Sequence, residues 1–126
     1  MSERQVLQPT AQHPITVEPT GGSVVVRIGD TVIAETDAAL SLSESTYPVV
    51  QYVPLSAIDP GALTRSDTTT YCPYKGEATY FHVTVGDETV EDAIWTYESP
   101  YPAVGDIAGH GAFYADKADV AVSAAS

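Results

Sequence analysis

Basic side chains are scarce in this chain. Five Lys plus Arg stand against seventeen Asp plus Glu, which gives a formal net charge of -12. A field of this sign repels the phosphates of nucleic acids and the headgroups of anionic membranes. We therefore expect neither a nucleic-acid nor a membrane partner. The acidic balance also keeps a protein soluble, and it would suit a salty cytoplasm equally well.

Cysteine is nearly absent as well. The one cysteine, Cys72, excludes an internal disulfide. It also excludes a structural zinc ion held by paired Cys-x-x-Cys motifs.

Long hydrophobic runs are missing. Gly, Pro, Asp or Glu interrupts every run before it approaches the roughly 18 apolar residues that a membrane-spanning helix needs. The opening residues Met-Ser-Glu-Arg-Gln do not resemble a secretory leader. We therefore expect a cytoplasmic protein.

Length and composition predict one domain. The chain has 126 residues, of which 44% are hydrophobic, enough to bury a single core. The first fourteen residues are polar and carry no periodic pattern. We predict a flexible arm over residues 1–14, a single β-rich domain over 15–122 and a frayed tail over 123–126.

Short β-branched runs predict strands. Residues 24–28 and 31–34 flank Gly29-Asp30, a pair typical of a tight hairpin turn. Residues 39–42 and 49–53 also have strand patterns. The segment 54–70 is rich in turn residues and hydroxyls, and we expect it to be mostly loop.

A second hairpin is predicted over residues 78–97. A four-residue connection at 86–89 places Phe81 opposite Ile94, and Val85 opposite Val90. Because side chains alternate between faces, Tyr80 and Trp95 then share an aromatic face with His82 beside them, and the other face is aliphatic.

The remaining pattern completes a mainly β fold. Residues 103–108 favour one helical turn, and 112–115 and 119–122 favour closing strands. We predict a mainly β domain of antiparallel sheets with at most one short helix.

Reactive groups gather in the segment 69–78. It holds Cys72, Lys75 and Glu77 around a Pro and Gly turn. A nearby ammonium favours the thiolate form of a cysteine, so Cys72 is a candidate nucleophile or redox thiol with Lys75 as its activator. His82 or His110 would act as acid and base, since His13 lies on the predicted arm. The alternative is that Cys72 is a small packed side chain.

Metal and nucleotide chemistry have weaker support. Cys72, His82 and His110, with Glu77 as a fourth ligand, could converge on a metal, but no paired spacing marks them, so we predict no metal site. Nucleotide transfer requires clustered carboxylates and a phosphate loop, and Lys75-Gly76 is too short for one.

Aromatic residues near this segment suggest a ligand pocket instead. Aromatic walls with a few polar groups are the usual composition of small-molecule sites. The same rings could equally form the core of a small β domain. The predicted ligand-binding residues are Tyr74, Glu77, Tyr80, Trp95 and Tyr97, with Lys75 and His82 adding polar contacts.

Four stretches resemble a known family. They are Thr-Tyr-Cys-Pro-Tyr-Lys-Gly at 70–76, Trp-Thr-Tyr at 95–97 and Ile-Ala-Gly-His-Gly-Ala-Phe-Tyr at 107–114, with Tyr-Pro-Val-Val-Gln-Tyr-Val-Pro at 47–54 as a fourth. In this order and spacing they resemble the domain of unknown function 427 family. The resemblance implies a β-tent fold, and the family sometimes carries a nucleotidyltransferase-like label. Members often have a His where this chain has Thr68, so a site that used that imidazole would be altered here.

Together these features favour a binding domain. We predict a soluble domain that binds a small molecule or partner in a cleft beside the Cys72–Glu77 loop, with the cofactor unknown. An enzyme using Cys72, a nucleotidyltransferase-like activity and a structural interaction module are the alternatives. The chain would be a monomer, or a homodimer paired through an exposed strand edge.

Overall fold

Antiparallel strands dominate the structure, which confirms the predicted mainly β class. The computed structural model describes residues 6–124. Within that range, seven strands form one sheet in the order β1-β4-β5-β9-β8-β7-β6, and three form a second in the order β10-β2-β3. The strands are β1 (Ile15–Pro19), β2 (Gly22–Ile28), β3 (Thr31–Thr36), β4 (Leu40–Glu44), β5 (Val50–Pro54), β6 (Leu63–Cys72), β7 (Gly76–Val85), β8 (Glu88–Tyr97), β9 (His110–Phe113) and β10 (Asp119–Ala124).

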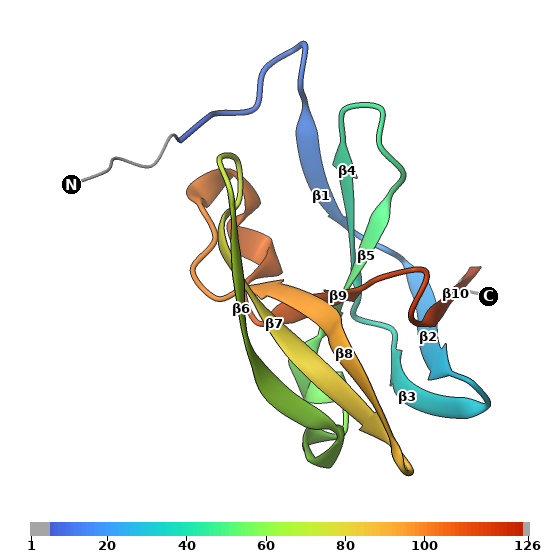
Figure 1. Cartoon of the computed structure of the whole chain (residues 1–126). Helices are drawn as coiled ribbons and strands as arrows, with labels where there is room; N and C mark the ends of the chain where they lie inside the picture. Colours follow the sequence, from blue (N-terminus) through green and yellow to red (C-terminus); the bar gives the residue numbers. More distant parts are fainter. Residues whose placement is uncertain (1–5, 125–126) are drawn as a thin grey trace.

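The large sheet has two arms. Figure 1 shows β6, β7 and β8 as one arm and β1, β4 and β5 as the other, with β9 joining them. Helical structure among residues 6–124 is limited to short 3-10 segments, which are η1 (Leu55–Ala57), η2 (Pro60–Ala62) and η3 (Pro102–Ile107). Segment η3 is the helical turn predicted near residue 103. No helix in this part of the chain is long and apolar enough to cross a membrane.

The first predicted hairpin is confirmed. Strands β2 and β3 pair in antiparallel register, with Ile28 opposite Thr31. Gly29 in the turn has φ of 60°, a left-handed conformation that glycine adopts without steric cost.

The second hairpin has the predicted register over half of its length. Phe81 pairs with Ile94 and Tyr80 with Trp95, as the alternation required. Beyond Phe81 a bulge in β8 shifts the register, so Val85 lies opposite Glu88 rather than Val90. The predicted four-residue connection was therefore wrong, because Gly86-Asp87 closes a two-residue turn and the bulge takes up the extra residues.

This hairpin separates two hydrophobic cores. Val83 and Ile94 lie fully buried in an aliphatic core that also takes in β2 and β3. Tyr80 and Tyr97 point to the other side, into an aromatic core with Tyr52 of β5. The predicted division into an aliphatic and an aromatic face is confirmed.

The prediction that residues 54–70 are mostly loop was wrong. Strand β6 begins at Leu63, where it pairs with Val83, and ends at Cys72 beside Gly76. Threonine is β-branched and suits an extended backbone. The pairing with β7 therefore outweighs the local turn preference of these hydroxyl-bearing residues.

Both chain ends make ordered contacts up to the limits of the described residues. Residues 1–5 of the predicted arm and 125–126 of the predicted tail lie outside them. From Leu7 onward the arm bonds to the domain, because the Leu7 N–H donates to the Pro73 carbonyl at 2.9 Å. At the other end, β10 continues to Ala124, past the predicted domain boundary at 122.

Replacing Gly111 with alanine should destabilise the fold. A Cβ there would lie 2.6 Å from Ile94 Cγ2 and 2.9 Å from Leu55 Cδ2. Ile94 is fully buried and cannot move away freely, so we expect a loss of about 1–3 kcal/mol in the free energy of unfolding. Urea denaturation measures it. Gly105→Ala is the control, since a Cβ there meets nothing within 4 Å. Equal stability of the two variants would contradict this packing.

Candidate functional site

The turn between β6 and β7 brings Cys72 and Lys75 together. The Lys75 N–H donates to the Cys72 carbonyl at 3.2 Å, which folds the turn back on itself. Lys75 Nζ then lies 4.0 Å from Cys72 Sγ. Lys75 is buried at 9% exposure, whereas Cys72 is half-buried. The structure therefore places the ammonium inside the domain, in contact with the thiol.

A carboxylate from another strand compensates this buried charge. Lys75 Nζ donates to Glu44 Oε1 at 2.6 Å, at the end of β4. The second carboxylate oxygen, Oε2, accepts a hydrogen bond from His13 Nε2 at 2.8 Å. Burial acts to raise the pKa of Glu44, but the hydrogen bonds and charges of Lys75 and His13 outweigh it and hold this pKa below its ordinary value.

His13 stacks on Tyr74, the residue before Lys75 in the turn. Its ring lies 4.4 Å from the Tyr74 ring at an interplanar angle of 12°. We call Cys72, Lys75, Glu44, His13 and Tyr74 the thiol cluster. The sequence placed His13 on an arm and did not consider Glu44. Nothing local marks either residue, since each contact joins positions 31 apart in the chain.

The aromatic core adjoins the thiol cluster. Trp95 Nε1 donates to the Tyr52 hydroxyl at 3.1 Å. Burial raises the pKa of Tyr52 to about 12, with the Trp95 bond opposing and the nearby Cys72 and Glu44 charges adding to it. Burial likewise raises the pKa of Tyr97, which lies near the same groups. Both phenols therefore stay neutral at physiological pH.

Tyr80 is also part of this core. Its hydroxyl bonds Thr70 Oγ1 at 3.0 Å and accepts a hydrogen bond from the Tyr114 hydroxyl at 3.3 Å. The ring of Tyr114 in turn lies 4.6 Å from that of Trp95, at a tilt of 50°. Tyr114 was not predicted as a site residue, although it lies within one of the stretches that carried the family resemblance.

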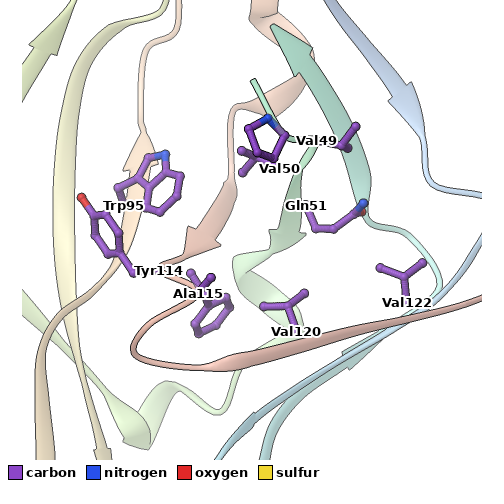
Figure 2. Close-up of a pocket in the computed structure, with 10 residues that line it drawn as sticks. Val49, Val50, Gln51, Trp95, Tyr114, Ala115, Val120 and Val122 are labelled. Carbon is purple, nitrogen blue, oxygen red and sulfur yellow. The ribbon is translucent and has the colours of Figure 1, made fainter. Parts of the chain in front are cut away.

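A groove opens on the outer side of Trp95. Its volume is about 390 Å³. Figure 2 shows side chains from β5, from the segment after β9 and from β10 around this space. The lining residues are Pro48, Val49, Val50, Gln51, Trp95, Phe113, Tyr114, Ala115, Val120 and Val122. Of the predicted ligand-binding residues, Trp95 alone is among them.

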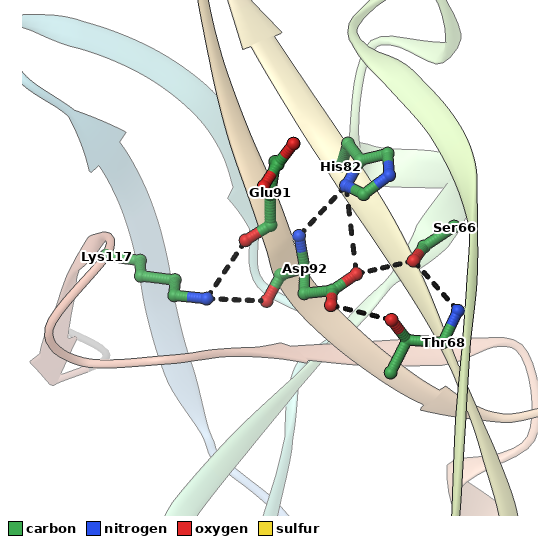
Figure 3. A network of polar contacts seen from close by, with 6 residues as sticks. All are labelled: Ser66, Thr68, His82, Glu91, Asp92 and Lys117. Carbon is green, nitrogen blue, oxygen red and sulfur yellow. Dashed lines mark hydrogen bonds and ion pairs between the residues drawn. The ribbon is translucent and has the colours of Figure 1, made fainter.

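His82 belongs to a separate polar network, shown in Figure 3. Its Nδ1 accepts the backbone N–H of Asp92 at 3.0 Å, so the ring proton of the neutral form is on Nε2. The Asp92 carboxylate accepts Ser66 Oγ at 2.5 Å and Thr68 Oγ1 at 2.8 Å. These two hydroxyls are the main reason that the pKa of Asp92 lies below its ordinary value.

The network supports the bulge in β8. Asp92 has φ of 49°, a strained conformation for a residue with a side chain. Its amide is satisfied by His82 rather than by the β7 backbone, and Lys117 Nζ caps the carbonyls of Glu91 and Asp92 at 2.9 and 3.3 Å. The polar groups freed by the bulge thus find side-chain partners.

Neither predicted acid–base histidine bonds to the thiol cluster. His82 is six residues along β7 from Gly76, a separation of about 20 Å for an extended strand. His110 begins β9, and its Nδ1 bonds the Ala108 carbonyl at 2.9 Å. Glu77 is an exposed residue of β7 opposite Tyr71. Among residues 6–124, no three His, Cys, Asp or Glu side chains are grouped to hold a metal ion.

These features define a mainly β domain with a partly buried thiol cluster and, lined by Trp95, an apolar groove. The model of the family described as NTP_transf_9, a domain of unknown function (DUF427), matches residues 16–124. The chain belongs to this family. No curated protein matches the chain at significant similarity.

Glu44→Gln should show how much the thiol cluster contributes to the stability of the fold. At pH 7 we expect a loss of about 2–3 kcal/mol in the free energy of unfolding, because Lys75 stays buried without its counter-charge. A carboxylate whose pKa is lower in the folded than in the unfolded protein stabilises the fold. This stabilisation is complete above the pKa of the unfolded state, about 4.3, and disappears as the pH falls through the pKa of the folded state.

The difference in the free energy of unfolding between wild type and Glu44→Gln should therefore narrow below pH 4. Urea denaturation at pH 7 and pH 3.5 measures it. Glu18→Gln, on the exposed side of β1, is the control, and its free energy of unfolding should match that of wild type at both pH values. A difference for Glu44→Gln that is independent of pH would contradict this account.

Proposed function

We propose that this domain binds a small, largely apolar molecule in the groove beside Trp95. The observation that carries the proposal is the groove itself, a hollow of about 390 Å³ walled by Trp95, Phe113 and Tyr114 and by aliphatic side chains. Pockets for small ligands usually measure about 300–1,000 Å³ and combine apolar walls with a few polar groups. Gln51 also lines the groove, and its amide bonds Thr20 Oγ1 and Ser41 Oγ.

Apolar side chains at the groove remain open to solvent. Val49 is 54% exposed and Val122 is 51% exposed. Both belong to the groove lining, one before β5 and one on β10. A ligand seated between them would remove this apolar surface from water, at a gain of about 25 cal/mol per Å².

The net charge of the chain favours a neutral or cationic ligand. None of the groove's ten described lining residues is Lys or Arg, and the chain as a whole carries a net charge of -12. Burial first, and then Tyr80 and the carboxylates of Asp92 and Asp116, raise the pKa of Tyr114. A phosphate-bearing nucleotide would meet repulsion in this field, so nucleotide transfer is not what we propose for the groove.

Our proposal moves the binding site predicted from the sequence. That prediction centred on the loop from Cys72 to Glu77, whose lysine is occupied by Glu44. Trp95 links the two places, because its ring lines the groove and its Nε1 bonds Tyr52 in the core that also contacts Cys72.

A neutral fluorescent probe tests the proposal. Trp95 is the single tryptophan, so N-phenyl-1-naphthylamine bound in the groove should quench its emission by energy transfer. Val122→Asp should weaken binding about tenfold or more, since a carboxylate would be desolvated against the probe. Val32→Asp is the matched control on another exposed valine, 45% exposed and outside the groove, and it should bind within about twofold of wild type.

Equal affinities of the two variants would defeat the proposal, as would the absence of quenching in wild type at the solubility limit of the probe. A thermal-shift screen of neutral and cationic metabolites then identifies the ligand class.

A second candidate function is thiol chemistry at Cys72. The observation in its favour is the 4.0 Å contact between Lys75 Nζ and Cys72 Sγ in a half-buried site. A fixed ammonium stabilises a thiolate, which is the nucleophilic form of cysteine. Such a thiolate would attack a substrate that carries an electrophilic carbon or a disulfide.

Lys75→Met tests this second candidate. We expect Cys72 to react with 4,4′-dithiodipyridine at pH 7 about five- to tenfold more slowly in the variant, because Glu44 then acts on the thiolate unopposed. Lys117→Met is the control, since Lys117 bonds carbonyls of β8 and not this cluster. Equal rates in all three proteins would contradict a role for Lys75 in activating the thiol.

A further inference from the structure

The described part of the N-terminal segment crosses the turn that carries Cys72 and Lys75. Near its start, the Leu7 N–H donates to the Pro73 carbonyl at 2.9 Å. At its end, the Pro14 carbonyl accepts the Ser45 N–H at 2.8 Å, next to Glu44. Figure 1 shows this dark-blue segment passing over the tip of the β6–β7 hairpin before it enters β1. We call residues 7–14 the strap.

His13 of the strap is itself a member of the thiol cluster. His13 stacks on Tyr74 with ring centroids 4.4 Å apart, and its Nε2 bonds Glu44 at 2.8 Å. The strap presents this ring through its own turn, in which the backbones of Thr10 and His13 exchange two hydrogen bonds of 3.1 Å. Thr10 Oγ1 also accepts the His13 N–H at 3.1 Å.

The strap has little apolar anchorage. Five of its eight residues are exposed, and Leu7, Pro9 and His13 are half-buried. No strap residue belongs to either hydrophobic core as described for residues 6–124. Segments held mainly by a few hydrogen bonds open locally at a small fraction of the free energy of global unfolding. The domain can therefore release the strap without losing its sheets.

We propose that the strap is a cover for the turn that carries Cys72 and Lys75, with His13 as its latch. Closed, it lies over the Cys72–Lys75 turn through its hydrogen bonds to Pro73 and Glu44 and its stack on Tyr74. Open, it leaves the Cys72 thiol accessible to solutes and leaves Glu44 Oε2 to solvent. The device regulates access to Cys72 whether or not the Trp95 groove binds a ligand.

The rate of Cys72 modification in the full chain tests the cover. The probe is 4,4′-dithiodipyridine, a neutral disulfide that the acidic surface does not repel. His13→Ala removes both the stack and the hydrogen bond to Glu44, and we expect Cys72 to react about tenfold faster. His13→Phe keeps an aromatic ring on Tyr74 and should give an intermediate rate. Gln12→Ala, an exposed strap residue beside the latch, is the matched control and should react as wild type does.

The direction of the change separates a cover from an electrostatic effect. His13 is positive when protonated, so its removal would by electrostatics alone disfavour the thiolate and slow the reaction. Amide hydrogen exchange gives an independent readout, because the Leu7 N–H should exchange faster in His13→Ala while core amides stay protected. Urea unfolding followed through Trp95 shows whether the variant remains folded. Should it not fold, His13→Gln, which can still donate to Glu44 but lacks the ring, is expected to react about threefold faster.

An unchanged or slower reaction of Cys72 in the folded variant would overturn the proposal. Unchanged protection of the Leu7 amide would do the same.

Discussion

The alternation of side chains along the β7–β8 hairpin organises the interior of this domain. Phe81 and Ile94 of the hairpin face the aliphatic core, and their neighbours Tyr80 and Trp95 face the aromatic core, because successive side chains of a strand point to opposite faces. Trp95 lies on the aromatic side. It therefore reaches Tyr52 in the core with its ring nitrogen and lines the outer groove with its ring. A slip of one residue would exchange the two cores and abolish both features.

Glu44 is the second constraint, and it acts between elements that are distant in sequence. One carboxylate oxygen holds the Lys75 ammonium inside the domain, and the other holds His13 of the strap. Each partner compensates part of the charge that burial makes costly. The same carboxylate thus couples the position of the strap to the environment of Cys72.

The bulge in β8 shows how a local irregularity is stabilised by its surroundings. Asp92 adopts a left-handed conformation, and its amide and carbonyl lose their regular strand partners. His82 and Lys117 replace those partners, while Ser66 and Thr68 hold the carboxylate. Irregularities of this kind persist only where neighbouring groups determine them. His82 therefore has a structural task in β8, at a distance from the thiol.

The sequence by itself determined several strands, the Gly29 turn and the two faces of the second hairpin, because these follow from the two-residue period and from the backbone preferences of neighbouring residues. It did not determine β6, because pairing with β7 outweighs the local turn preference there. It also marked Cys72 and Lys75 as neighbours, since three positions around a turn bring side chains together. Only the tertiary structure decided that Glu44 and His13 join them, and that Trp95 opens onto a groove. Glu44 is 31 positions from both Lys75 and His13, and no local pattern encodes which strand end will meet which turn. Such contacts depend on how the sheets bend and cross, a property of the whole chain.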